Sequence, residues 1–388
     1  MALKTVIVVG GSYVGSNVAQ QLAIISKGRF RILLIEKNSH FQHLFSFPRF
    51  AATRKVNTHK AFIPFGPATF GTAPNGIGRV IQAAVTSLTE SNVQLDREII
   101  LDGQHTDNIA YSFLVLATGT KLTPPSNMPG SEKHDGVAYL QNHASQVAER
   151  SRIVVIGAGA VGVQLAFDIK ELYPEKSVTL VHSRNTLMNR FHVGLSNLVI
   201  ERCKELGVDL ELGSRVKLPT NGYPTDGSSF QVELLNGKKI PSDFAIICTG
   251  MTPQSAILQS LSSGVINSDG FVRVRNTLQI DDPAYPNVFA LGDIANTDAP
   301  KAARPALKQA EIVAKNVSHL IEGEDLEAYE CIDPPAIHLT LGIKKNAVFR
   351  NPVPGSNEPV IMLRDDGTLD MNIDDVWTRR GGGPDAML

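Results

Sequence analysis

The chain has 388 residues, of which 43% are apolar and 19% charged, so at roughly 150 residues per domain it can form two or three domains. Its 37 basic residues against 38 acidic ones exclude the basic excess typical of nucleic-acid-binding proteins and of polybasic membrane clamps. The three cysteines, Cys203, Cys248 and Cys331, are far apart in the sequence and form no CxxC pair, zinc spacing or disulfide framework. We therefore predict an intracellular protein with no metal site.

The first predicted unit is a strand, a glycine-rich turn, a helix and a second strand. Continuous apolar residues at 5–9 and 31–35 are typical of parallel strands that helices cover on both faces. The turn between them carries Gly10 and Gly15 but has Ser12 where a dinucleotide-binding turn has its middle glycine. Because serine is small and keeps its N–H, we expect a pyrophosphate still to fit.

An acid supports this assignment. Glu36 ends the second strand, 21 residues after Gly15, where a carboxylate accepts hydrogen bonds from an adenosine ribose. The alternative interpretation is that Glu36 is a surface acid beside Lys37.

The second predicted unit repeats the first, 147 residues later in the chain. An apolar strand at 153–156 precedes Gly157-x-Gly159-x-x-Gly162, and a helix and the strand 177–181 follow. The glycines allow a tight turn, close approach to a pyrophosphate and close packing of helix on strand, while the helix N-terminus attracts the anion. This pattern predicts a second dinucleotide site.

The residues after this unit bear on the choice of cofactor. His182 and Arg184 stand where an acid would repel a 2′-phosphate, and Arg184 can pair with one. We expect the second site to accept NADPH, with or without NADH. The alternative is that Arg184 points into solvent.

Three further strands complete the pattern. Two of them end in Thr118-Gly119 and Thr249-Gly250, and the third ends in Gly292-Asp293 before a helix at 305–320. Asp293 can accept a hydrogen bond from a ribityl hydroxyl while the helix N-terminus faces flavin or phosphate.

The predicted fold class is therefore α/β, with two Rossmann-like dinucleotide-binding domains and a short C-terminal segment. A discontinuous FAD-binding domain spans 1–130 and 270–325, an NAD(P)H-binding domain spans 145–255, and an interface segment with a disordered tail spans 326–388.

The chain carries no recognisable address. It has no leader, no myristoylation glycine after Met1 and no apolar run of about 20 residues. We expect a cytoplasmic protein without a transmembrane segment, and we leave peripheral contact with membranes or mitochondria open.

Taken together, Glu36, Ala117-Thr118-Gly119, the second glycine motif and Ala290-Leu291-Gly292-Asp293 resemble the two-dinucleotide-binding flavoprotein superfamily. Within it, residues 173–183, 41–43, 300–302 and 338–342 resemble the AMID-like or ferroptosis suppressor protein branch, which is related to apoptosis-inducing factor and type II NADH dehydrogenases. The likeness weakens after about residue 343. It implies non-covalent FAD in the first domain, NAD(P)H in the second and reduction of a quinone or another small acceptor.

The resemblance also implies a set of cofactor-binding residues. On the flavin side these are Gly10, Ser12, Gly15, Glu36, Lys37, His43, Thr118, Gly119, Asp293 and Lys301. On the nicotinamide side they are Gly157, Gly159, Gly162, His182, Arg184 and Gly250.

Two departures from the family pattern affect function. Quinone-reducing relatives commonly carry Glu where this chain has Gln164, and an amide cannot relay protons. The end segment differs and contains the single tryptophan, Trp377, which we interpret as a packing residue.

The predicted activity is that of an NAD(P)H:acceptor flavoprotein oxidoreductase, with hydride passing to FAD and then to a quinone, dioxygen or another small acceptor. The flavin carries the chemistry, so no catalytic side chain is assigned beyond the candidates Gln164 and His43. Without CxxC there is no thiol relay for disulfide reduction. The alternatives are a tailoring oxidoreductase of specialised metabolism and a non-enzymatic redox sensor that binds a partner; the protein is expected to be a monomer or homodimer.

Overall fold

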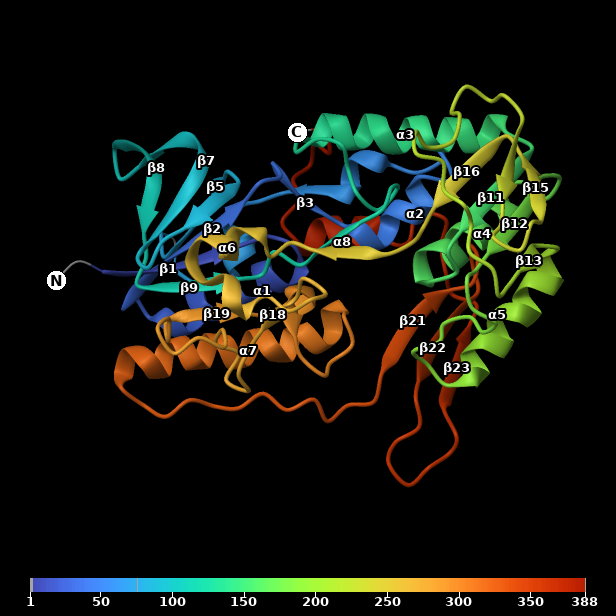
Figure 1. Cartoon of the computed structure of the whole chain (residues 1–388). Coiled ribbons are helices and arrows are strands. Elements are labelled where there is room, and N and C mark those ends of the chain that lie inside the picture. The colour runs from blue at the N-terminus through green and yellow to red at the C-terminus, as the bar shows by residue number, and fades with distance from the viewer. Residues whose placement is uncertain (1–2, 75, 388) are drawn as a thin grey trace.

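The first sheet is five-stranded and parallel. The computed structural model describes residues 3–74 and 76–387, and Figure 1 shows their arrangement. The strands follow the order β19-β9-β1-β2-β5. Their bounds are β1 Lys4–Val9, β2 Phe30–Glu36, β5 Gly78–Gln82, β9 Phe113–Leu116 and β19 Val288–Ala290.

Two apolar cores enclose this sheet because successive side chains of a strand point to opposite faces. Val6 and Val8 of β1 pack with helices α1 (Tyr13–Ser26) and α7 (Ala303–Glu322), whereas Ile7 and Val9 pack into the core on the other face. That second face is covered by a small antiparallel sheet and short elements. These are β6 Val85–Leu88, β7 Asn92–Leu101, β8 Gln104–Ala110, α6 Gln259–Ser262, β18 Val272–Arg273 and β20 Ala295–Asn296.

The second sheet repeats the first on a smaller scale. Its four parallel strands follow the order β13-β12-β11-β16, with helices against one face and the hairpin β14–β15 against the other. The bounds are β11 Arg152–Ile156, α4 Ala160–Leu172, β12 Ser177–Val181, α5 Val193–Leu206, β13 Asp209–Glu211, β14 Phe230–Glu233, β15 Lys239–Ser242 and β16 Phe244–Ile247.

The predicted α/β class with two parallel sheets is confirmed. Three strands end earlier than predicted: β9 ends at Leu116, β16 at Ile247 and β19 at Ala290, before the Thr-Gly and Gly-Asp dipeptides. Strand β19 follows the second sheet in the sequence and pairs with β9. The first sheet therefore contains strands that come before the second sheet in the sequence and one that comes after it. The domain limits themselves stay predictions.

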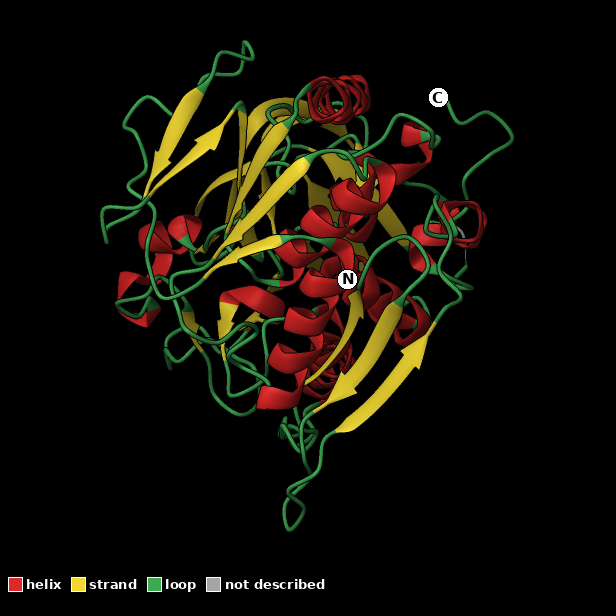
Figure 2. Ribbon diagram, turned by 90° about the vertical axis from the view of Figure 1, so that its right-hand side faces the viewer, coloured by secondary structure: helices red, strands yellow, loops and turns green. Residues whose placement is uncertain are grey.

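The two units are joined by the antiparallel strands β10 (Thr120–Leu122) and β17 (Met251–Pro253) and by α3 (Lys133–Glu149), which packs against both. The C-terminal sheet of β21 (Ala336–Thr340), β22 (Asn346–Arg350) and β23 (Val360–Arg364) lies on the helices of the second unit. Figure 2 shows the loop between β22 and β23 projecting away from the body of the molecule.

The chain ends by returning to the first unit. Helix α8 (Ile373–Arg379) packs with the short elements β3 (His40–Gln42), α2 (Phe47–Phe50) and β4 (Phe62–Pro64). Trp377 is 4% exposed in this cluster, as expected of a packing residue, and its indole N–H donates to Gly383 O at 2.8 Å. Disorder of the last residues stays a prediction.

One buried ion pair joins the two units and the C-terminal segment. Arg49 of α2 lies 2.6 Å (Nε to Oδ2) from Asp168 of α4, and the two side chains are 1% and 0% exposed. Arg49 also donates to the carbonyl oxygens of Gly342 at 2.9 Å and Thr368 at 3.0 Å. Burial raises the pKa of Asp168 to about 6, although Arg49 opposes the shift.

Replacing Asp168 by Ala should therefore lower the free energy of unfolding by about 3–5 kcal/mol, because it leaves the Arg49 charge buried without a counter-ion. Equilibrium denaturation measures the change. The control is Glu311→Ala, since Glu311 pairs with Lys308 at 3.0 Å between side chains that are 43% and 57% exposed; its effect should stay below about 1 kcal/mol. Equal effects of the two changes would contradict the assignment.

A second buried contact should make stability depend on pH. His143 of α3 contacts Ala51 O through Nδ1 at 2.7 Å, and burial lowers its pKa to about 4. Between pH 6.5 and 4 the unfolded chain takes up a proton that the folded chain does not, so stability is present at neutral pH and is lost on acidification. The difference in unfolding free energy between wild type and His143→Gln should change by about 3 kcal/mol from pH 7 to pH 4. Parallel pH profiles would show that His143 does not titrate in this way.

Candidate functional site: two dinucleotide-binding turns

The first glycine turn joins β1 to α1 and packs against the residues that follow β9. The space there is too small for a side chain at Gly10 or Gly15. Gly10 has φ +98°, and a Cβ atom there would lie 2.5 Å from Ala117 O. At Gly15 a Cβ atom would lie 1.6 Å from Gly10 O. Ser12 caps α1, is exposed, and makes no side-chain capping hydrogen bond. The backbone at the start of α1 is therefore positioned to receive an anion.

The second turn has the same geometry. Gly157 has φ +109°, and a Cβ atom there would lie 2.5 Å from Cys248 O. A Cβ atom at Gly162 would lie 1.8 Å from Gly157 O, whereas one at Gly159 would meet nothing within 4 Å. In both sheets the turn follows the strand at which the strand order reverses, β1 or β11, which is where open α/β sheets bind ligands.

Glu36 is held in place at the end of β2. The residue is 7% exposed, and its carboxylate accepts from Gly11 N at 2.5 Å and from Asn38 N at 2.9 Å. The interpretation as a freely solvated surface acid is therefore wrong, whereas Lys37 beside it is exposed.

Gly119 and Gly250 end corresponding strands of the two units, with φ +63° and +76°. The strands that follow them, β10 and β17, pair with each other. Thr118 Oγ1 donates to Gln254 O at 2.8 Å, and Gln254 Nε2 donates to Thr118 O at 2.7 Å. This reciprocal pair joins Thr118, which follows β9, to Gln254, which follows β17, so it fastens the first unit to the second beside the crossing strands.

Asp293 and Lys301 lie together after β19. Burial raises the pKa of Asp293, and the nearby Lys301 opposes the shift. Thr120 Oγ1 donates to Asp293 Oδ2 at 3.4 Å. The ammonium of Lys301 lies 4.7 Å from the centre of the Phe271 ring, and burial lowers its pKa.

The candidate His43 follows β3 and is 9% exposed. Its Nδ1 lies 2.9 Å from the Tyr13 hydroxyl. Burial lowers its pKa to about 4, and Arg380 and Arg379 add to the shift. A neutral imidazole beside α1 can hydrogen-bond, but it is a poor proton donor at neutral pH.

His182 and Arg184 follow β12, as expected. Ala158 N donates to His182 Nδ1 at 3.3 Å, while Nε2 is buried with no hydrogen-bond partner. Burial lowers the pKa of His182, and Arg184 contributes to the shift. Arg184 is exposed and so is free to meet a ligand.

The candidate Gln164 points away from open solvent and towards the C-terminal segment. It is 8% exposed, and its amide nitrogen lies 3.5 Å from Met371 Sδ. It sits one helical turn before Asp168, whose pairing with Arg49 the sequence did not reveal. No local pattern marks that pair, since its members are 119 positions apart.

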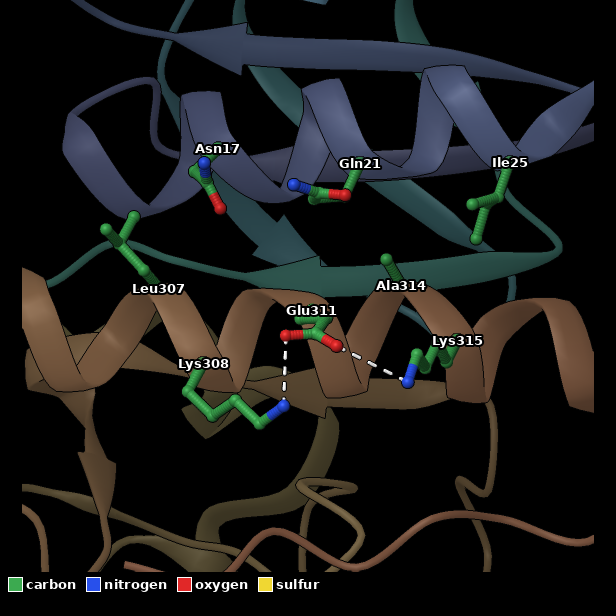
Figure 3. Close-up of a pocket in the computed structure, with 8 residues that line it drawn as sticks. All are labelled: Asn17, Gln21, Ile25, Leu307, Lys308, Glu311, Ala314 and Lys315. Carbon is green, nitrogen blue, oxygen red and sulfur yellow. Dashed lines mark hydrogen bonds and ion pairs between the residues drawn. The ribbon is translucent and has the colours of Figure 1, made fainter. Parts of the chain in front are cut away.

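Other features of the described residues add no chemistry. A surface hollow between α1 and α7 is lined by Asn17, Gln21, Ile25, Leu307, Lys308, Glu311, Ala314 and Lys315, and Glu311 pairs with both of its lysines (Figure 3). Within 3–74 and 76–387 no group of His, Cys, Asp or Glu could hold a metal ion. Over the same ranges no helix is both long and apolar enough to cross a bilayer.

The residues present fit two dinucleotides. Each turn has glycine where a Cβ atom would collide with backbone, and Gly159 leaves open the space at the start of α4. Glu36 and Asp293 stand beside the first turn with carboxylates that the protein already orients. FAD would be held at the first turn and NAD(P)H at the second.

Comparison with known proteins agrees with this geometry. Residues 4–310 match the family described as pyridine nucleotide-disulphide oxidoreductase. "Fe-regulated protein 8" of Mycosarcoma maydis is 34% identical over 99% of this chain and 96% of its own length. Ferroptosis suppressor protein 1 of Homo sapiens is 30% identical over 88% of this chain and 86% of its own length.

Solved structures share the fold. The sulfide:quinone oxidoreductase of Aquifex aeolicus superposes with a TM-score of 0.73 at 18% identity, covering 98% of this chain and 92% of that one. The resemblance to the ferroptosis suppressor and apoptosis-inducing-factor relatives is confirmed. The chain therefore belongs to the pyridine nucleotide-disulphide oxidoreductase family, whose members are FAD-dependent NAD(P)H oxidoreductases.

Proposed function

We propose that this protein oxidises NAD(P)H bound at the second glycine turn, Gly157–Gly162, and reduces a quinone, dioxygen or another small acceptor by way of FAD bound at the first, Gly10–Gly15. The observation that carries the proposal is the presence of two glycine turns of the same shape, one in each of the two units that the Thr118–Gln254 hydrogen bonds join. Hydride transfer is the chemistry that the nicotinamide and flavin supply when bound. The protein's part is to bind, orient and exclude water.

The cysteines support a thiol-free route. All three lie among the described residues, and none forms a disulfide. Burial raises the pKa of the Cys203 thiol to about 11 and that of Cys248 to about 12, so neither is a thiolate at neutral pH. Transfer to a small acceptor is therefore favoured over disulfide reduction, despite the family's name.

Gln164 supports a second candidate. An amide in this buried position cannot pass a proton to a bound quinone, which favours a tailoring oxidation of another small substrate. Turnover with NAD(P)H and simple quinones would support the first proposal, whereas flavin reduction without quinone turnover would support the second. Failure of NAD(P)H to reduce the flavin would support the redox-sensing alternative.

The decisive experiment is anaerobic addition of NADH or NADPH to the purified protein, followed by visible absorption. We expect the flavin bands of wild type to bleach. Gly159→Leu should abolish bleaching while FAD stays bound. The leucine side chain would fill the open space in which the NAD(P)H pyrophosphate is proposed to bind, and φ of −79° at this position allows any residue, so the fold is kept.

The matched control is Gly162→Ala, whose Cβ atom would lie 1.8 Å from Gly157 O; it should destabilise the fold instead of only blocking the cofactor. Bleaching in Gly159→Leu at the wild-type rate would show that the nicotinamide binds elsewhere.

Arg184 provides a test of cofactor choice. Arg184→Ala should raise KM for NADPH by about tenfold, the loss expected for one charge-assisted hydrogen bond, with little change for NADH. Steady-state kinetics with both donors measures the split, and Arg215→Ala, another exposed cation of the same unit, is the control. Equal changes for the two donors would remove the argument for 2′-phosphate recognition.

A further inference from the structure

A C-terminal arginine lies against the start of the first dinucleotide-binding turn. Arg380 follows α8, the red helix near the centre of Figure 1. Its guanidinium carbon lies 3.5 Å from the centre of the Phe41 ring and 5.6 Å from that of Tyr13. Tyr13 is the first residue of α1 and follows Ser12 directly. The last described helix of the chain thus brings a cation to the glycine turn between β1 and α1.

This cation lacks an anionic partner. Across the described ranges the guanidinium of Arg380 makes no ion pair with a carboxylate and no hydrogen bond, although the residue is half-buried. Burial lowers the pKa of Arg380, and the neighbouring Arg379 lowers it further. Contact with two aromatic faces compensates only part of the free energy needed to desolvate a charge. Arg380 therefore has unused N–H donors and an unneutralised charge.

The start of α1 also attracts an anion, although one carboxylate, that of Glu36, already accepts from Gly11 N. The first turn of α1 contains no acidic residue, and Ser12 leaves the helix N-terminus without a side-chain cap. His43, hydrogen-bonded to the Tyr13 hydroxyl, has a pKa of about 4 through burial and through Arg380 and Arg379. An anion at this point would meet both the helix dipole and a guanidinium.

We propose that Arg380 binds the diphosphate of FAD, so that the C-terminal helix forms part of the flavin site. The inference rests on the proposed function, which puts FAD at the first glycine turn. The planar guanidinium offers paired N–H donors that match phosphate oxygens. Phe41 and Tyr13 hold its plane before the cofactor arrives, so little side-chain freedom is lost on binding.

The test separates cofactor binding from folding. In Arg380→Met we expect the FAD dissociation constant, measured from flavin fluorescence on dilution of the holoprotein, to rise about 10- to 100-fold. The unfolding midpoint of the FAD-free protein should stay the same or rise, because methionine keeps the apolar contacts and removes an unpaired charge.

Arg379→Met is the matched control, since Arg379 is exposed on the same helix, and it should change FAD affinity by less than about twofold. Arg380→Lys keeps the positive charge but lacks the paired N–H donors of the guanidinium, so it should give an intermediate affinity for FAD.

Two results would overturn the inference: unchanged FAD affinity in Arg380→Met, or a fall in the unfolding midpoint of its FAD-free form, which would make Arg380 structural. Either can occur while wild type binds FAD. Wild type that holds no FAD would overturn the proposed function itself.

Discussion

The buried pair between Arg49 and Asp168 holds three separate parts of the molecule in one arrangement. Arg49 belongs to the first unit, Asp168 to the second, and the carbonyl oxygens of Gly342 and Thr368 to the C-terminal segment. Charges without access to water are tolerated only when their hydrogen-bonding groups are satisfied. The guanidinium meets that condition only when all three parts are in place.

The position of this pair gives it a role in the site. Asp168 lies on α4, the helix that begins at the second glycine turn, and Arg49 lies on α2, shortly after His43. The pair therefore ties α4 to the first unit. The Thr118–Gln254 hydrogen bonds tie the two units together at a second place, beside the crossing strands β10 and β17. Hydride transfer between two bound rings depends on such fixed alignment.

The duplicated units were accessible to sequence analysis because their signals are local. An apolar run followed by a glycine turn predicts a buried strand and a helix start, and both turns have the positive φ and close backbone contacts that require glycine. The contacts that join the units were not accessible, since Arg49 and Asp168 are ordinary charged residues in the sequence and only the tertiary fold buries them. Arg380 likewise belongs to the end segment, in which the predicted family resemblance weakens. No periodic pattern marks the phenylalanines between 41 and 50 as core residues, yet three of them form a core with Trp377.

The discontinuity of the first sheet has a consequence for biosynthesis. Chains emerge from the ribosome N-terminus first, and domains fold as units when their last element appears. All four strands of the second sheet are complete by Ile247, whereas the first sheet waits for β19 at Val288–Ala290 and its covering helix α7. The strands of the second sheet can therefore pair before those of the unit that began translation, although the helices of the second unit stay uncovered until β21 and β22 are made. On the proposed function, capture of the flavin is then a late event, because Asp293 and helix α8 are among the last parts to reach the first unit.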